Sequence, residues 1–297
     1  MGKMKKNRKT MLFVPGNTPS LFKDVISYEI DTVMFDLEDS ISVEEKDSAR
    51  ELTKNMINFF NYNQYNIEVA VRINHFDTIF YEEDLKVMVS ESKTNILRLP
   101  KIETKEDVLK IISDIEKLEK QFNRKEEIKL FCALESAKGI LNAYEIATSS
   151  KRVVGIALGG VDYLLNLQAV KTNSRHELLF ARQMIVHAAR AANIDAFDCI
   201  YSNIQDLKGL IQETQFAKEL GFNGKSAIHP NQLPIINNIF TPNKKEISES
   251  LKILHAYKEH QQSNKGVFSI EGQMIDKPVI QHAENILMRA NIKNPLI

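Results

Sequence analysis

The sequence predicts a (β/α)8 barrel, and two features of its hydrophobic pattern carry that prediction. Eight short apolar runs alternate with amphipathic stretches over about 230 residues, which is the count and size of such a barrel. The runs are too short for helices, and near-continuous apolar runs are typical of parallel strands buried on both faces. The expected strands are Met11–Pro15, Thr32–Leu37, Ile67–Ile73, Asn95–Pro100, Ile128–Glu135, Arg152–Gly159, Asp195–Ile200 and Gly224–Ile228.

The stretches between these runs have the periodicity of helices. Glu44–Phe60 is expected to be helical, Lys105–Gln121 places its aliphatic residues on one face, and Leu178–Ala192 is rich in alanine. A doubly wound open sheet is the alternative fold. Its dinucleotide-binding form needs G-x-G-x-x-G after the first strand, where this chain has only Gly16, and no P-loop is found. The pattern therefore favours the barrel.

The pattern changes after Pro230, which predicts a barrel domain over residues 1–240 and a helical extension or lid over 241–297. Helices are expected at Lys244–His260 and from about Pro278 to Ala290. The segment Gly266–Pro278 holds two glycines and a proline, which favours a lid-like loop between them. We expect the extension to pack on the barrel or on a neighbouring subunit.

Composition excludes several classes of protein. Lys and Arg total 39 and so do Asp and Glu, which argues against a nucleic-acid binder that depends on bulk positive charge. No apolar run reaches the length of a membrane span, and the opening residues lack the apolar core of a signal peptide. Two cysteines suit a reducing compartment, so we expect a cytoplasmic globular protein. The basic residues of the N-terminus are expected to form a solvated tail rather than a site for an anionic partner: Lys3, Lys5, Lys6, Arg8 and Lys9.

Charged and polar residues follow the predicted strands, and catalysis in a barrel takes place at the carboxyl ends of its strands. Hard oxygen ligands without a Cys–His cluster favour Mg2+ or Mn2+ over zinc. An arginine beside such a site would bind a substrate carboxylate or oxyanion. The candidates are Asp36, Glu38, Asp39, Arg72, Lys101, Glu135, Asp162, Ser202, His229 and Asn231.

Structural roles compete with these assignments. Asp39 or Ser40 are candidate N-caps for the helix at Glu44–Phe60, and Glu135 could simply favour the start of the helix that follows it. His187 and His229 are expected to be structural. Cys132 and Cys199 lie within apolar runs and are expected to be small core residues.

The candidate residues lie in a series of short motifs that runs from about Lys9 to the final helix. In chain order the motifs are MLFVPGN, VMFDLEDSI, EKDSAR, VRIN, LRLPK, ALESAKGI, GIALGGVDY, ELLFARQMIVHAARAANIDAFD, GFNGKSAIHPNQ and SIEGQMIDKPVI. Taken together, these motifs resemble the citrate lyase β-chain family, within the broader HpcH/HpaI-type aldolases.

The resemblance implies a TIM barrel and a site with assigned roles. It makes Glu135 and Asp162 the Mg2+ ligands, with Glu135 also contacting substrate, and it makes Arg72 a substrate-binding and catalytic residue. Asp36 and Glu38, with Asp39, would lie near the metal, and Asp36 and Glu38 are counted with Arg72 among the catalytic residues. Lys101 is expected to pair with rim carboxylates rather than act as a nucleophile, since this chemistry needs no Schiff base.

The activity implied is Mg2+-dependent cleavage of a citryl thioester on an acyl carrier protein to oxaloacetate and an acetyl thioester. Such a β subunit would associate with citrate lyase α and γ chains and form a homo-oligomer. Two departures concern the substrate: Gly160 and Val161 replace the usual Ala-Glu pair, and IHPNQ resembles the malyl- and citramalyl-CoA lyase relatives. A stand-alone CoA-ester lyase is therefore an alternative, and a catalytically silent barrel subunit is a second one.

The proton donor for the acetyl fragment is expected outside the rim. In the lyase relatives a C-terminal aspartate reaches the site of a neighbouring subunit, and the matching residue here is Asp276. The alternative is that Asp276 only N-caps the final helix, which would have Pro278 in its first turn.

Overall fold

The computed structural model describes residues 7–172, 174–260, 268–270 and 272–296. Lys3, Lys5 and Lys6 of the predicted tail lie outside the described residues, as does Gly266 of the predicted lid. The chain divides into two compact units, Met1–Asn237 and Asn238–Ile297. Their boundary falls within α10 (Leu233–Phe240), close to the expected junction at 240/241.

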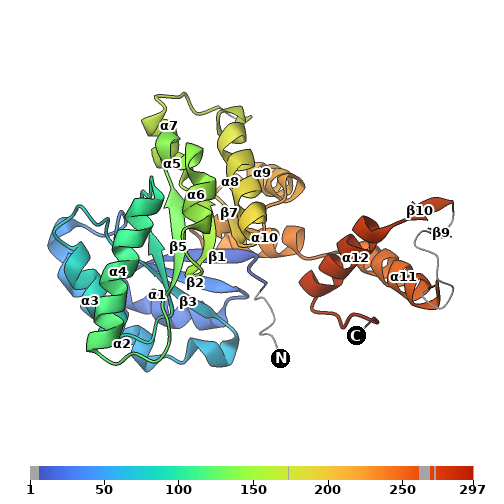
Figure 1. The fold of residues 1–297 in the computed structure, drawn as a ribbon. Coiled ribbons are helices and arrows are strands. Elements are labelled where there is room, and N and C mark those ends of the chain that lie inside the picture. The colour runs from blue at the N-terminus through green and yellow to red at the C-terminus, as the bar shows by residue number, and fades with distance from the viewer. Residues whose placement is uncertain (1–6, 173, 261–267, 271, 297) are drawn as a thin grey trace. The chain divides into compact units, whose positions relative to one another are not determined.

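Eight parallel strands of the first unit close into a barrel in chain order, which confirms the predicted fold (Figure 1). The barrel closes where β1 pairs with β8 through Met11 and Ser226. Each strand lies within one of the predicted apolar runs or at its edge, because burial on both faces demands apolar residues along its whole length. The strands are β1 (Thr10–Pro15), β2 (Thr32–Asp36), β3 (Glu68–Arg72), β4 (Ile96–Leu99), β5 (Lys129–Leu134), β6 (Val153–Leu158), β7 (Asp195–Asp198) and β8 (Gly224–Ala227).

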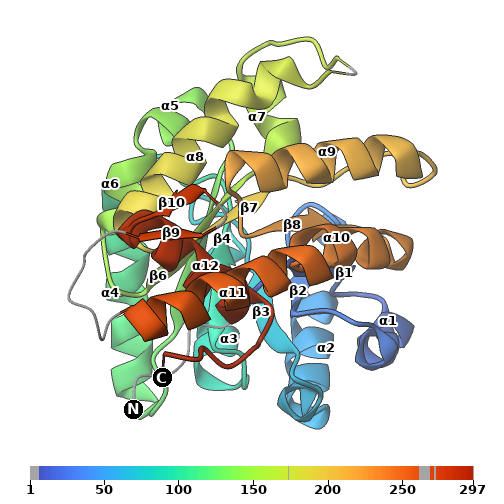
Figure 2. The same ribbon diagram turned by 90° about the vertical axis from the view of Figure 1, so that its right-hand side faces the viewer.

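Helices surround these strands (Figures 1 and 2). α4 has the predicted bounds because a capping box of Thr104 and Asp107 fixes its first turn. The predicted helix at Glu44–Phe60 begins later, at Lys46, and its N-cap is Glu45. The expectation that Asp39 or Ser40 caps it is therefore wrong. The helices are α1 (Pro19–Asp24), α2 (Lys46–Phe59), α3 (Tyr81–Ser90), α4 (Lys105–Gln121), α5 (Ala137–Leu141), α6 (Ala143–Thr148), α7 (Gly160–Asn166), α8 (Leu179–Ala192) and α9 (Leu207–Leu220).

Side chains fill the barrel interior, so that it is a core and not a channel. The interior cluster consists of Met11, Met34, Ala70, Ile96, Phe131, Ala157 and Phe197. At the amino ends of the strands, Arg8 donates to Glu68 Oε2 at 2.5 Å and to Asp195 Oδ2 at 2.6 Å. The side chain of Arg8 is only 10% exposed. The prediction of a solvated tail is wrong for Arg8, because a single basic residue in a basic run gives no sign of its buried acidic partners.

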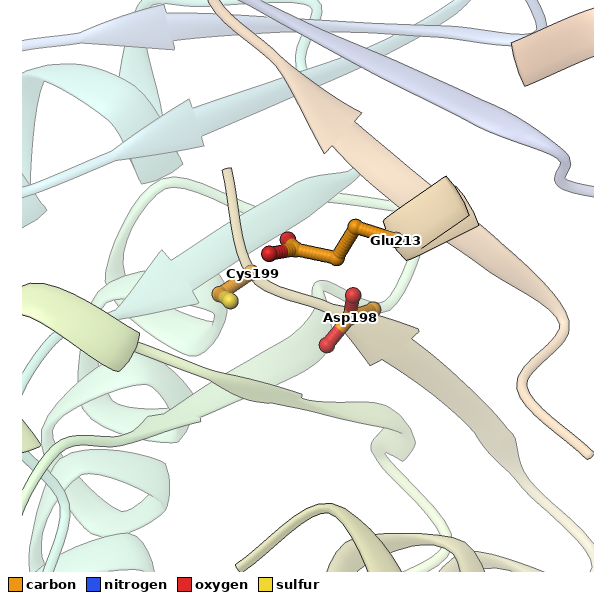
Figure 3. A group of neighbouring side chains, drawn as sticks. All are labelled: Asp198, Cys199 and Glu213. Carbon is orange, nitrogen blue, oxygen red and sulfur yellow. The ribbon is translucent and has the colours of Figure 1, made fainter. Parts of the chain in front are cut away.

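A buried ionic network joins β7, β8, α8 and α9 on one side of the barrel. Asp198 accepts from Arg182 Nε at 2.8 Å and from Lys225 Nζ at 2.6 Å, and Lys225 also donates to Glu213 Oε1 at 2.7 Å. Figure 3 shows the two carboxylates beside the thiol of Cys199, with ligand atoms within 4.8 Å of one another. Because the two carboxylates already pair with arginine and lysine, we assign this group to stability and not to metal binding.

The cysteines are buried free thiols, as expected. Cys199, however, does not lie among apolar side chains alone. Its sulfur accepts from Arg182 Nη2 at 3.8 Å and from Arg175 Nη2 at 3.7 Å. The apolar run around it gave no sign of these partners, which come from other segments of the chain.

The second unit has its own small core. The predicted helix α11 (Lys244–His260) packs against α12 (Lys277–Arg289), and apolar side chains of both helices form the contact. The buried residues are Leu254, Ile275, Ile280, Ala283 and Leu287. The described part of the expected lid loop forms an antiparallel pair, β9 (Phe268–Ile270) with β10 (Gln273–Ile275). A plain loop is thus the wrong description of these residues, whose strands have only three residues each, too few for a periodicity to show in the sequence.

None of the helices in the described part of the chain is both long enough and apolar enough to cross a membrane.

Asp198→Asn tests the buried network. Burial opposes ionisation of Asp198, but the charges of Arg182 and Lys225 outweigh it and hold its pKa well below the usual range. A carboxyl with a lowered folded-state pKa stabilises the fold above its unfolded pKa, and this contribution is lost as the pH falls toward the folded value. We expect the substitution to lower the free energy of unfolding by roughly 3–5 kcal/mol at neutral pH, and by less near pH ~3.

Urea unfolding at the two pH values measures the effect. Glu83→Gln is the control, because its pair with Lys86 lies on the surface and is worth at most about 1 kcal/mol. A loss for Asp198→Asn that is equal at both pH values would contradict the linkage.

Candidate active site

A cavity of about 550 Å³ lies at the carboxyl ends of the barrel strands. It brings together five of the predicted residues: Asp36, Asp39, Arg72, Glu135 and Asp162. The other lining residues are Phe13, Pro15, Ser40, Arg98, Leu158, Gly159, Gly160, Val161, Ile200, Ser226 and Ile228. Of the remaining candidates, Ser202, His229 and Asn231 are not among the described residues that line this cavity.

Arg72, the last residue of β3, is held by acidic side chains on three sides. Its Nε and Nη2 donate to the two oxygens of Asp36, both at 2.7 Å, and its Nη1 lies 2.9 Å from Glu38 Oε2. Burial would raise the pKa of Asp36, but the bidentate bonds and charge of Arg72 hold it below the usual range. The expected charge partnership of Lys101 is also present: its Nζ lies 2.6 Å from Glu38 Oε1.

Side chains from the surrounding elements hold the backbone of the acidic loop after β2. Lys46, at the start of α2, donates to Leu37 O at 2.8 Å and to Glu38 O at 2.6 Å. Asn74 donates to Leu37 O at 2.9 Å. Lys46 of the EKDSAR motif and Asn74 of the VRIN motif therefore fix the backbone of the loop that carries Glu38. Neither of these two side chains lines the cavity.

Asp84 of α3 completes this support. Its Oδ2 accepts from the Asn74 side chain at 2.6 Å, and its Oδ1 accepts from Arg50 Nε at 2.6 Å. Sequence reasoning missed Asp84, because it lies within a charged helical stretch and no spacing signals that it is fully buried.

Glu135 follows β5 and is 5% exposed. Burial, together with the negative charge of Glu38, raises the pKa of Glu135 to about 7. Its Oε2 is buried, and none of the described residues forms a hydrogen bond with it. Gly159 makes room for it, since a Cβ there would lie 2.4 Å from Glu135 Cγ. The N-cap of the helix that follows, α5, is Ser136, whose Oγ accepts from Gly139 N at 3.1 Å.

The donor set of the cavity fits a hard divalent cation. Asp162, half-buried in the first turn of α7, lines the cavity with Glu135, Asp36 and Asp39, and no described lining residue is a cysteine or a histidine. Mg2+ takes one or two carboxylates of this kind. An unpaired buried carboxylate oxygen such as Glu135 Oε2 is costly, and a cation would satisfy it.

Two lining residues were missed by sequence reasoning. Arg98 of β4 is 3% exposed and Ser226 of β8 is 2% exposed, and both Arg98 Nε and Ser226 Oγ are buried without a hydrogen-bond partner. For Arg98 the sequence did hold a signal, because it lies inside the apolar run Asn95–Pro100 and charged residues are rare in strands buried on both faces.

The two histidines have structural roles, as expected. His229 Nδ1 accepts from Asn231 N at 3.2 Å and caps the short turn that follows β8. His187 Nδ1 lies 2.7 Å from the carbonyl of Gln183, one turn earlier in α8.

Asp276 lies in the second unit, where it is the N-cap of α12. Its Oδ1 accepts from Val279 N at 3.2 Å, and Pro278 stands in the first turn. The structural role considered for Asp276 is thus present, and its catalytic role stays a prediction.

Residues 9–230 match the sequence profile of the HpcH/HpaI aldolase/citrate lyase family. The chain belongs to this family. The family predicted from the motifs is thereby confirmed, and with it the class of carbon–carbon lyases.

Individual relatives in the family match the chain over nearly its full length. It is 42% identical over 285 residues to citrate lyase subunit beta of Leuconostoc mesenteroides subsp. cremoris, covering 96% of this chain and 93% of that protein. It is 31% identical over 293 residues to mitochondrial citramalyl-CoA lyase of Rattus norvegicus, covering 95% and 86%. The crystal structure of protein CitE from Mycobacterium tuberculosis, in complex with magnesium, acetoacetate and coenzyme A, matches with a TM-score of 0.78 at 27% identity, over 96% of this chain and 98% of that one.

Gly160, one of the two departures from the family pattern, packs against Cys199. A Cβ at position 160 would lie 2.9 Å from the Cys199 sulfur and 3.1 Å from its Cβ. We therefore expect Gly160→Ala to cost roughly 1–3 kcal/mol of unfolding free energy through overpacking. In a Cys199→Ala background the sulfur is gone, so the same substitution should cost less.

A double-mutant cycle by urea denaturation measures this coupling. Equal costs of Gly160→Ala in the two backgrounds would show that Cys199 is not the obstacle.

Proposed function

We propose that this protein cleaves a citryl thioester to oxaloacetate and an acetyl thioester, as the β subunit of citrate lyase. The observation that carries the proposal is the cavity at the barrel mouth. It gathers the carboxylates of Asp36, Glu135 and Asp162 beside arginine side chains, in a chain 42% identical to a citrate lyase subunit beta. We further infer a cytoplasmic location from the two reduced, buried cysteines.

Glu135 and Asp162 are the residues that would hold Mg2+. Magnesium is present in the related CitE structure, and the unpaired Oε2 of Glu135 gives this chain a ready ligand. When bound, Mg2+ supplies a Lewis acid that polarises the substrate hydroxyl and adjacent carboxylate.

Cleavage breaks the bond between the hydroxyl-bearing carbon and the methylene beside the thioester. The hydroxyl loses its proton and becomes the ketone of oxaloacetate, while the electron pair of the broken bond passes to the acetyl fragment, which then takes up a proton. Arg72 stabilises the negative charge on the reacting oxygen. Asp36 and Glu38 serve this step by fixing the guanidinium of Arg72, which they hold at 2.7 Å and 2.9 Å.

Glu135→Gln and Asp162→Asn test the metal assignment. Each removes a charged oxygen ligand, so we expect cleavage of citryl thioester to fall at least about 10-fold, with a matching loss of Mg2+ affinity. Steady-state kinetics and isothermal titration with MgCl2 measure the two effects. Glu145→Gln is the control, since Glu145 is exposed and lies outside the cavity. Near-wild-type activity of both site variants after EDTA treatment would overturn the assignment.

The acyl carrier and the partners follow from the same proposal. A citrate lyase β subunit would receive its substrate on an acyl carrier protein and bind α and γ chains, and we propose that it also forms a homo-oligomer. IHPNQ and the 31% identity to a citramalyl-CoA lyase favour a second candidate, a stand-alone lyase of CoA esters. Cleavage of the carrier-protein ester but not the CoA ester, with co-purification of the other two chains, supports the first. A catalytically silent subunit would cleave neither ester and would give no substrate-dependent Mg2+ titration.

Asp276 is our candidate for the acid that protonates the acetyl fragment, acting from a neighbouring subunit. We expect Asp276→Asn to lower kcat by on the order of 10²–10⁴ while Mg2+ affinity stays unchanged. Mixing this variant with Glu135→Gln should restore part of the activity, because mixed oligomers would combine intact residues from two chains. A change in thermal stability with unchanged kcat would leave Asp276 with only its N-cap role.

A further inference from the structure

Arg98 is a buried cation that forms no ion pair with the described residues. Its Nη1 donates to the sulfur of Met11 at 3.7 Å, and its Cζ lies 5.2 Å from the centroid of the Phe13 ring. Its Nε is buried and has no hydrogen-bond partner in the described part of the chain. Burial, and then the charge of Arg72, lower the pKa of Arg98 to about 10. Because an unpaired buried charge is costly, such a side chain is expected to acquire an anion from outside the protein.

The two arginines of the cavity differ in this respect. Arg72 and Arg98 are register partners on β3 and β4, and both lie over the ring of Phe13. Arg72 already has anionic partners in the protein, since it donates to both oxygens of Asp36 and its Nη1 lies 2.9 Å from Glu38 Oε2, although not all of its five N–H groups are used. Arg98 is therefore the cavity arginine that lacks a carboxylate partner among the described residues, and it lines the same cavity as Ser226 of β8, whose Oγ is buried and has no hydrogen-bond partner among those residues.

The substrates of the candidate reactions differ by one charged group. A citryl thioester carries two free carboxylates, one on the hydroxyl-bearing carbon and one on a side arm. A citramalyl thioester has a methyl group in place of that arm, and a malyl thioester has a hydrogen atom. Only the citryl substrate therefore brings a second carboxylate that needs its own cationic partner in a buried site.

We propose that Arg98 binds the second, side-arm carboxylate of the substrate and thereby selects the dicarboxylic citryl thioester over its monocarboxylic relatives, with Ser226 Oγ as an additional donor. This inference rests on the proposed cleavage activity. A site built around an arginine rejects an analogue without the carboxylate, because the guanidinium then stays buried and unpaired. Arg72 and the metal ligands are left for the carboxylate and hydroxyl that all three thioesters share.

Arg98→Met tests the proposal, because it keeps much of the side-chain volume and removes the charge. We expect the ratio of kcat/KM for citryl thioester to kcat/KM for citramalyl thioester to fall roughly 10²-fold, mainly through loss of citryl cleavage. Arg98→Lys keeps the charge but not the fork of donors and should restore part of the ratio. Arg190→Met, the loss of an exposed arginine on α8 outside the cavity, should leave the ratio unchanged.

Binding gives a second readout that needs no turnover. Isothermal titration of the Mg2+-loaded protein should show tighter binding of oxaloacetate than of pyruvate, and Arg98→Met should abolish that preference. Circular dichroism and thermal unfolding establish that each variant is folded. If Arg98→Met fails to fold, Arg98→Lys and Ser226→Ala decide, and an unchanged substrate ratio and ligand preference in both would overturn the proposal.

The outcomes separate the two proposals. Wild-type protein that cleaves citramalyl but not citryl thioester overturns the proposed function, and the oxaloacetate–pyruvate comparison then decides the role of Arg98. Wild-type protein that cleaves citryl thioester, with an Arg98→Met variant that loses both substrates equally, supports the function and overturns the role of Arg98 as a selector.

Discussion

The bidentate pair between Arg72 and Asp36 determines how the mouth of the barrel is built. Two charges are taken out of water there, which is tolerable only if the geometry is good and the remaining donors and acceptors are satisfied. Glu38 lies beside Nη1 of the same guanidinium and is itself paired with Lys101. Lys46 and Asn74 donate hydrogen bonds to the backbone of the loop that carries both acids. The result is a rigid acidic loop on one side of the cavity, with Glu135, Arg98 and Ser226 left unsatisfied on the other.

Local pattern was sufficient to predict the eight barrel strands, several of the helices and the residues at the barrel mouth. Buried strands need apolar residues throughout, and amphipathic helices repeat at a fixed period, so α4 and α11 were found with their observed bounds. Residues that follow consecutive strands meet at one end of a barrel, so the positions of Asp36, Arg72 and Glu135 could be predicted together.

What could not be predicted depends on partners far away in the chain. Arg98 and Arg8 differ from ordinary charged residues only in what surrounds them, and Asp84 looks like any acidic residue of a helix. The thiol of Cys199 sits in an apolar run but meets Arg175 and Arg182 from other segments. Short strands such as β9 and β10 carry too few residues for their alternation to stand out from a loop.

The ion pairs of Arg8 with Glu68 and Asp195 affect how the newly synthesised chain folds. Arg8 leaves the ribosome long before its partner Asp195, which lies 187 positions later, at the beginning of β7. The amino end of the barrel therefore cannot be locked until most of the first unit has been synthesised. Until then Arg8 has only Glu68 as a partner, and the growing sheet is open at an edge. Contacts of such sequence separation slow folding, because the intervening chain must be ordered before they form. The nascent protein therefore exposes strand edges to other chains and to proteases until β7 and β8 have been synthesised and the barrel can close.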